Sequence, residues 1–291
     1  MTVIVGLNGY PGLILCADSQ ETVQGYSKKS VYKLEEWDHK PFRFSIGAAG
    51  VGHYCDMLST QISNTLLNIP TFDLQLIGTA IQETLLDFYP KHIWSRPQGD
   101  RADVETLIAI QPLPDGHCEM FQTCETALKY IKDSFASIGI GCHLADYIAA
   151  RLYSSSGGLR HQVATAVYVL SEVIENIDGC GKEPLILFFG QDGTHRQIYP
   201  DEIARFAEGF RQYDDTEKEV FQFVTDVGES SRLFWGLDHV VKSITDAREM
   251  CESWAEFVED RDARFHAWVK RSRQDRKMAT ANPSALNNSD T

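Results

Sequence analysis

The chain has 291 residues, of which 43% are hydrophobic and 23% are charged, which is ordinary for a globular protein with one main domain and some additional segments. Its formal net charge of −14 opposes binding to a phosphate backbone, which depends on clustered Lys and Arg side chains, so we expect no nucleic-acid partner. No apolar run approaches the roughly 20 residues of a membrane-spanning helix, and no secretory signal opens the chain, so we expect a cytoplasmic protein without a membrane partner.

The first fifty residues carry the pattern of short β-strands. Residues 2–7 are rich in β-branched side chains, and residues 13–17 form an apolar run of strand length. The intervening residues 8–12 read Asn-Gly-Tyr-Pro-Gly, a composition typical of a hairpin turn. Two more strands are expected over residues 31–35 and 42–46.

Helices and strands then alternate. Apolar residues recur at helical spacing in four segments, and Pro90 marks the expected end of the second helix. These helices are expected over residues 51–67, 74–89, 142–153 and 161–177. Further strands are expected over residues 105–110, 118–122, 136–140, 184–189 and 195–199. The order predicts an α+β fold in which two stacked sheets carry helices on both outer faces, a four-layer αββα sandwich.

Beyond residue 211 the composition becomes more charged and helical. We therefore expect a main domain over residues 2–211 and a helical C-terminal extension over residues 212–278. Residues 279–291, which are rich in Asn, Ser and Ala, are expected to form a disordered tail. The aromatic residues of the extension are interpreted as packing residues and not as a cofactor site: Trp235, Trp254, Phe257 and Trp268.

The cysteines and histidines do not suggest a metal site. The seven cysteines contain no C-x-x-C pair, and the nine histidines show no paired metal-binding spacing. We interpret the cysteines as reduced, buried, small apolar residues. The glycine pairs lack the Lys-Ser/Thr of a phosphate-binding loop, so we expect neither a metal nor a cofactor.

The start of the chain provides a candidate nucleophile. Because a small residue follows Met1, we expect Met1 to be removed, which gives Thr2 a free α-amino group. A threonine hydroxyl needs a base to become a good nucleophile, and an α-amino group, with an ordinary pKa of about 7.7 to 8.0, is suited to accept its proton. Thr2 can thus supply nucleophile and base together.

Two charged residues are expected close to Thr2. Asp18 follows the strand that should pair with residues 2–7, which places it near the N-terminus. Lys33 falls within an expected apolar strand, where an unpaired ammonium group is costly. Asp18 is therefore the expected partner of Lys33.

Residues 2–37, TVIVGLNGYPGLILCADSQETVQGYSKKSVYKLEEW, resemble the N-terminal region of proteasome β-subunits and of the bacterial HslV-type protease. The resemblance covers roughly residues 2–211, mainly through element order after the first fifty. It implies an N-terminal-nucleophile (Ntn) hydrolase that cleaves peptide or amide bonds. By position, Thr2 matches the nucleophile, Asp18 its acidic partner, and Lys33 the lysine that tunes the local electrostatics.

The same resemblance assigns three later positions. The turn at residues 46–52 resembles the one whose glycine N–H, here Gly50, stabilises the oxyanion. Asp178 is the expected late acidic residue. Ile140 stands where these proteins usually have a serine that hydrogen-bonds the N-terminal amine, and Ser137 or a water is the expected substitute.

Three functions stay open at this stage. The first is threonine-type hydrolysis of a peptide; the second is a catalytically silent, structural or regulatory proteasome-like subunit, which Ile140 favours; the third is hydrolysis of a small amide. The resemblance also implies a homo-oligomer, such as a ring, and leaves a separate ATPase partner open. Side-chain specificity depends on the direction of residues after Asp18 and around Gly50, which the sequence does not fix.

Overall fold

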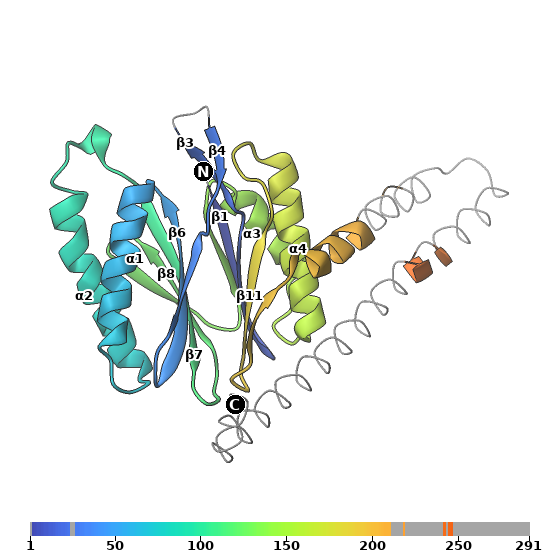
Figure 1. Ribbon diagram of the computed structural model, residues 1–291, viewed down its shortest axis with the longest axis horizontal. Coiled ribbons are helices and arrows are strands. Elements are labelled where there is room, and N and C mark those ends of the chain that lie inside the picture. Colours follow the sequence, from blue (N-terminus) through green and yellow to red (C-terminus); the bar gives the residue numbers. More distant parts are fainter. Residues whose placement is uncertain (1, 24–26, 211–217, 219–240, 243, 247–291) are drawn as a thin grey trace, which may run out of the picture. The chain divides into compact units, whose positions relative to one another are not determined.

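The computed structural model describes residues 2–23, 27–210, 218, 241, 242 and 244–246 (Figure 1). By its contacts the chain divides into two units, Met1–Ala207 and Glu208–Thr291. In the second unit, residues 218, 241, 242 and 244–246 are helical. The remainder of the expected extension, with its four aromatic residues, and the expected tail lie outside the described residues.

Two five-stranded antiparallel sheets form the centre of the first unit (Figure 1). Sheet 1 has the order β10-β1-β2-β11-β12, with β1 (Val3–Asn8), β2 (Gly12–Ala17), β10 (Phe135–Gly139), β11 (Leu185–Gly190) and β12 (His195–Ile198). Sheet 2 has the order β5-β6-β7-β8-β9, with β5 (Leu34–Asp38), β6 (Phe42–Gly50), β7 (Val104–Pro112), β8 (Glu119–Cys124) and β9 (Ala127–Ile131). A separate hairpin pairs β3 (Gln20–Val23) with β4 (Ser27–Ser30).

The two sheets face each other through an apolar core. Ile4 and Leu15 of sheet 1 share one buried cluster with Leu107 and Met120 of sheet 2. Every residue of β1, β2 and β11 is buried, because these strands are covered on both faces. Burial on both faces explains why their sequences are continuous apolar runs without the alternation of a half-exposed strand.

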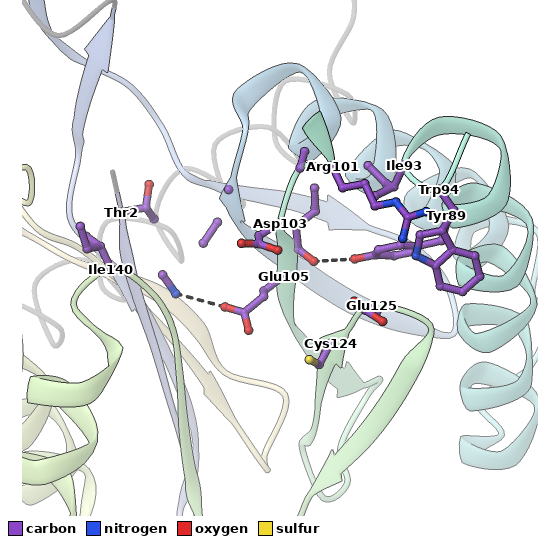
Figure 2. Close-up of a pocket in the computed structure, with 15 residues that line it drawn as sticks. Thr2, Tyr89, Ile93, Trp94, Arg101, Asp103, Glu105, Cys124, Glu125 and Ile140 are labelled. Atoms are coloured by element: carbon purple, nitrogen blue, oxygen red, sulfur yellow. Dashed lines mark hydrogen bonds between the residues drawn. The ribbon is translucent and has the colours of Figure 1, made fainter. Parts of the chain in front are cut away.

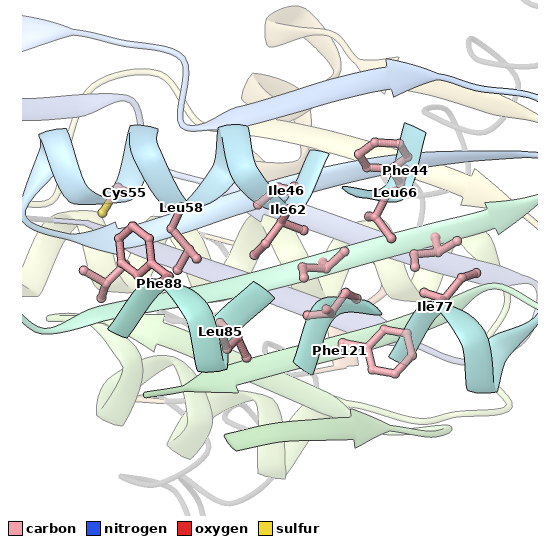
Figure 3. Close-up of a cluster of buried hydrophobic side chains, with 14 of the residues drawn as sticks. Phe44, Ile46, Cys55, Leu58, Ile62, Leu66, Ile77, Leu85, Phe88 and Phe121 are labelled. Carbon is pink, nitrogen blue, oxygen red and sulfur yellow. The ribbon is translucent and has the colours of Figure 1, made fainter. Parts of the chain in front are cut away.

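Each sheet packs against a pair of helices. The helices α1 (Gly52–Leu67) and α2 (Leu74–His92) cover sheet 2, and Figure 3 shows Phe44 and Phe121 of the sheet among side chains such as Leu58 and Leu85 of these helices. The helices α3 (Cys142–Leu152) and α4 (Leu159–Asn176) contact β1, and α4 also contacts β2. A short 3-10 helix, η1 (Gln98–Asp100), precedes β7. None of the helices in the described part of the chain is long and apolar enough to span a membrane.

Several sequence predictions of local structure were wrong. Residues 31–33 are not in a strand, because β5 begins at Leu34. Pro90 does not end α2, which continues to His92. Proline has no N–H to bind the carbonyl of Leu86, four residues earlier, and the helix nevertheless continues for two residues beyond it.

Other elements were not predicted at all. They are the hairpin of β3 and β4, the strand β9, and the helix over residues 200–210. The hairpin reads Gln-Glu-Thr-Val and Ser-Lys-Lys-Ser, and β9 is mostly exposed, so neither carries the apolar signal by which a strand is recognised.

Candidate active site

Thr2 lies directly before β1 and is partly buried at the end of sheet 1. The next residue, Val3, is paired with Gly139 at the end of β10. Gly139 has a φ of +89°, and a Cβ added there would overlap the Thr2 carbonyl oxygen. A glycine at this position therefore lets β10 close against the backbone of Thr2.

Asp18 anchors the segment that carries Thr2. Its side chain is completely buried and directly follows β2. The Oδ1 atom accepts hydrogen bonds from the Val3 backbone N–H at 2.9 Å and from Lys33 Nζ at 2.8 Å. The Oδ2 atom accepts from the backbone N–H groups of Gln20 at 3.2 Å and Gly181 at 3.1 Å. A buried carboxylate with four donors is fully compensated.

The predicted ion pair between Asp18 and Lys33 is thus present, and the lysine side chain is only 7% exposed. Asp18 Oδ1 accepts from both Lys33 Nζ and the N–H of Val3, the residue that follows Thr2. The ammonium group therefore lies close to the segment that carries Thr2. Thr2, Lys33 and Gly50 also line the same cavity, which has a volume of about 510 Å³. We call it the Lys33-side cavity.

Gly50 closes this cavity at the end of β6, where it pairs with Val104 of β7. Its φ is +136°, a conformation that side chains rarely adopt, and an added Cβ would overlap the Asp103 carbonyl oxygen. The position therefore requires glycine for two separate reasons. The helix α1 begins two residues later, at Gly52.

A second cavity, of about 550 Å³, also contains Thr2 and Gly50 (Figure 2). We call it the Ile140-side cavity, because Ile140 lines it and is 52% exposed. Glu105 lines it as well and accepts a hydrogen bond from the Gly139 N–H at 3.4 Å. Thr2 and Gly50 thus lie where the two cavities meet.

Ser137 does not replace the serine that Ile140 displaces. Its hydroxyl lies 2.6 Å from Asp146 Oδ1 and 3.0 Å from the Cys142 carbonyl oxygen, both in α3. Ser137 is absent from the residues that line either cavity in the described part of the chain. The expected substitution by Ser137 is therefore not found.

Asp178 is exposed and lines neither of the two cavities that contain Thr2. Its segment reaches the site through backbone instead, because the Gly181 N–H binds Asp18. Between them, Cys180 is 6% exposed, and burial, followed by the nearby Asp18 carboxylate, raises the pKa of its thiol to about 11. Cys180 is therefore a neutral thiol near pH 7 and a poor competing nucleophile.

The sequence analysis did not single out three carboxylates of the Lys33-side cavity. Glu21 of β3, Glu35 of β5 and Asp56 of α1 all line it. Desolvation, and then the charge of Asp56, hold the pKa of Glu35 above its ordinary value. No sequence motif joins these residues, since they come from three separate elements. Among the described residues, no group of three or more His, Cys, Asp or Glu side chains is arranged to hold a metal ion.

The fold is shared with solved structures of other proteins. The chain matches no family model, and no curated protein matches it significantly. It is similar in structure to Anbu proteins. A Gly-1 mutant of Anbu from Hyphomicrobium sp. strain MC1 has a TM-score of 0.63 at 14% identity, covering 79% of this chain and 99% of that one.

Two further solved structures give the same result. Anbu, described as an ancestral beta-subunit, from Yersinia bercovieri has a TM-score of 0.61 at 14% identity, covering 78% of this chain and 99% of that one. The helical assembly of the Anbu complex from Pseudomonas aeruginosa has a TM-score of 0.64 at 12% identity, covering 79% and 99% respectively. At such low identity the likeness shows the fold alone.

These comparisons correct the family that the sequence suggested. The expectation of a proteasome β-subunit or HslV-type protease was wrong, because the similar structures are Anbu proteins, a distinct family with a proteasome-like Ntn fold. The N-terminal motif could not separate these families. In this chain its residues build the end of a strand and a buried ion pair.

Proposed function

We propose that this chain is a subunit of a proteasome-like homo-oligomer, with residues 2–211 forming a four-layer αββα Ntn-hydrolase sandwich. Two facing sheets, each with its own helix pair, support this architecture. The Anbu complex from Pseudomonas aeruginosa is described as a helical assembly, which supports self-association of this fold into an open or closed array.

We further propose that the site hydrolyses amide bonds with Thr2 as its nucleophile. The observation that carries this proposal is the buried Asp18–Lys33 pair. Asp18 binds the backbone N–H of the residue after Thr2, and Lys33 lines the same cavity as Thr2 and Gly50. A buried ion pair adds little to the free energy of unfolding, because removing both charges from water opposes its formation. A role in setting the charge around Thr2 accounts for its place in the fold.

The mechanism begins once Met1 is removed. The Lys33 ammonium group favours the neutral, basic form of the Thr2 amine over the protonated form, and it does so against the opposing charges of Asp18 and the cavity carboxylates. Thr2 Oγ attacks the substrate carbonyl carbon while the amine accepts the hydroxyl proton, and the Gly50 N–H donates to the oxyanion. The C–N bond then breaks, the amine returns the proton to the leaving nitrogen, and water hydrolyses the acyl-enzyme ester.

Intact-protein mass spectrometry tests this mechanism, before and after treatment with an epoxyketone or β-lactone that reacts with N-terminal threonine. We expect loss of Met1 and one covalent adduct on Thr2, and no adduct in Thr2→Ala. A chain that retains Met1, or a free Thr2 that remains unmodified, contradicts the hydrolytic proposal.

A catalytically silent subunit is the second candidate, and Ile140 favours it. An apolar side chain at the edge of the cavity offers no hydrogen bond to the Thr2 amine. The comparisons also support a shared architecture more directly than a shared reaction, since they rest on the fold alone. An oligomer seen by native mass spectrometry that forms no adduct at Thr2 would identify a silent subunit. A monomer that hydrolyses amides would identify a small-amide hydrolase.

A further inference from the structure

We propose that the Lys33-side cavity selects a cationic side chain, Lys or Arg, of a peptide substrate beside the bond that is cleaved. This inference rests on the proposed function, because the cavity is identified as a substrate site by its contact with Thr2 and Gly50. It adds the substrate class, which the fold does not provide.

The cavity has an excess of negative charge. Its walls hold three carboxylates, from Glu21, Glu35 and Asp56. Its lysine, Lys33, is bound to the buried Asp18, which does not line the cavity. With three negative charges and a positive charge already matched by Asp18, the cavity is left with a formal charge of −3 when His53, which also lines it, is neutral.

Two of these carboxylates have no ion-pair partner among the described residues. There, neither the Glu35 nor the Asp56 side chain takes part in a hydrogen bond or an ion pair. Glu35 and Asp56 nevertheless interact, because the Asp56 charge contributes to the raised pKa of Glu35. A cation placed between two such like charges stabilises both of them. Since no metal-binding group is found among the described residues, an organic cation suits the cavity better than a metal ion.

The size and walls of the cavity also fit a long basic side chain. Its volume of about 510 Å³ lies within the usual range of ligand pockets. Val31, Ile46 and Cys55 give it apolar surface, against which the methylene groups of Lys or Arg can pack. Tyr32 also lines the cavity and is 84% exposed, so its ring is free to lie against a cationic group.

Peptide binding to the full chain carrying Thr2→Ala tests the proposal without requiring hydrolysis. The probes are fluorescent alanine-rich octapeptides that differ only in one central residue, Lys, Leu or Glu, and the readout is fluorescence anisotropy. A charge-assisted contact predicts about tenfold tighter binding of the Lys peptide than of the Leu peptide, with the Glu peptide weakest. Adding Glu35→Gln and Asp56→Asn should reduce the Lys preference to about twofold or less.

A matched control separates the cavity from the general acidity of the protein. Glu83 is exposed on α2 and lines neither cavity, so Glu83→Gln removes one charge without touching the site. This variant should keep the full preference for Lys. Equal affinity for the Lys and Leu peptides, no binding of the Lys peptide, or a preference that survives both cavity substitutions overturns the proposal.

Hydrolysis by the chain with Thr2 intact distinguishes this failure from failure of the proposed function. If Thr2 forms its adduct and the Leu peptide is cleaved as readily as the Lys peptide, only the selectivity is wrong. If the Lys peptide binds preferentially but neither adduct nor cleavage is seen, hydrolysis is wrong and the cation-selective cavity stands.

Discussion

Replacing Asp18 with Asn removes the charge that holds the candidate site together while changing the shape of the side chain very little. Each Asp18 oxygen accepts two hydrogen bonds, from Val3 and Lys33 at Oδ1 and from Gln20 and Gly181 at Oδ2. An asparagine retains only one of these oxygens and places an NH₂ group against donors at the other. It also removes the negative charge that lies 2.8 Å from the ammonium group of Lys33, in a position that is only 7% exposed.

The expected cost follows from this geometry. Breaking a buried ion pair by removing one partner typically lowers the free energy of unfolding by about 3–5 kcal/mol. For a domain of this size, each kcal/mol corresponds to about 2–4 °C in Tm, so Asp18→Asn should lower Tm by about 6–20 °C. Because Val3 is one of the bound groups, adduct formation at Thr2 should be lost even at temperatures where the variant remains folded.

Thermal unfolding followed by circular dichroism measures the first effect, and mass spectrometry of the treated protein measures the second. Glu83→Gln is the control, since it removes an exposed carboxylate that lines neither cavity and should change the unfolding free energy by no more than about 0.5 kcal/mol. Lys33→Met combined with Asp18→Asn should be less destabilising than the sum of the two single changes, because both break the same pair. If the free energy of unfolding of Asp18→Asn differs from that of the unsubstituted chain by less than about 1 kcal/mol, the ion pair does not organise the site as described.

Two further predictions concern the walls of the cavities. Gly50→Ala should destabilise the fold by about 1–3 kcal/mol and abolish adduct formation at Thr2, because the added Cβ overlaps the Asp103 carbonyl oxygen; a variant labelled at the normal rate would show that β6 can shift without cost. The preference for the Lys peptide should fall as pH is lowered, since a raised pKa means that Glu35 loses its charge at a higher pH than an ordinary glutamate. The same shift makes the contribution of Glu35 to the free energy of unfolding most favourable at low pH, and this contribution is lost as pH rises through the raised pKa. Glu35→Gln should therefore slightly raise Tm at pH 7. Anisotropy and Tm measured from pH 4 to 8 check both effects, and a preference for the Lys peptide that does not change with pH would contradict the first.

Much of the fold could be predicted because it follows from local patterns. The continuous apolar runs of β1 and β2 and the helical spacing in α1 and α4 are visible in the sequence, and all four elements form within two residues of the expected bounds. The Asp18–Lys33 pair was also predictable, since a lysine among apolar residues requires a nearby carboxylate. The strand expected around Lys33 was wrong, because the lysine lies in the connection that leads to β5.

The similarity to Anbu proteins was not predictable from the same residues. The short motif around Thr2, Asp18 and Lys33 indicates a fold, and solved structures of only 12% to 14% identity share that fold. The position of Asp178 was not predictable from the sequence either. Its place in the sequence suggested a site residue, but the register of the loop after α4 brings the Gly181 backbone to Asp18 and leaves Asp178 exposed.

The sequence by itself determined the apolar strands, the amphipathic helices and the pairing of Asp18 with Lys33, because burial acts on each of these segments through its own composition. Only the tertiary structure decided what surrounds Thr2. Glu21, Glu35 and Asp56 converge on one cavity from a hairpin, a strand and a helix. Their directions depend on strand register and on the rotation of α1 about its axis, which are set when the elements pack together.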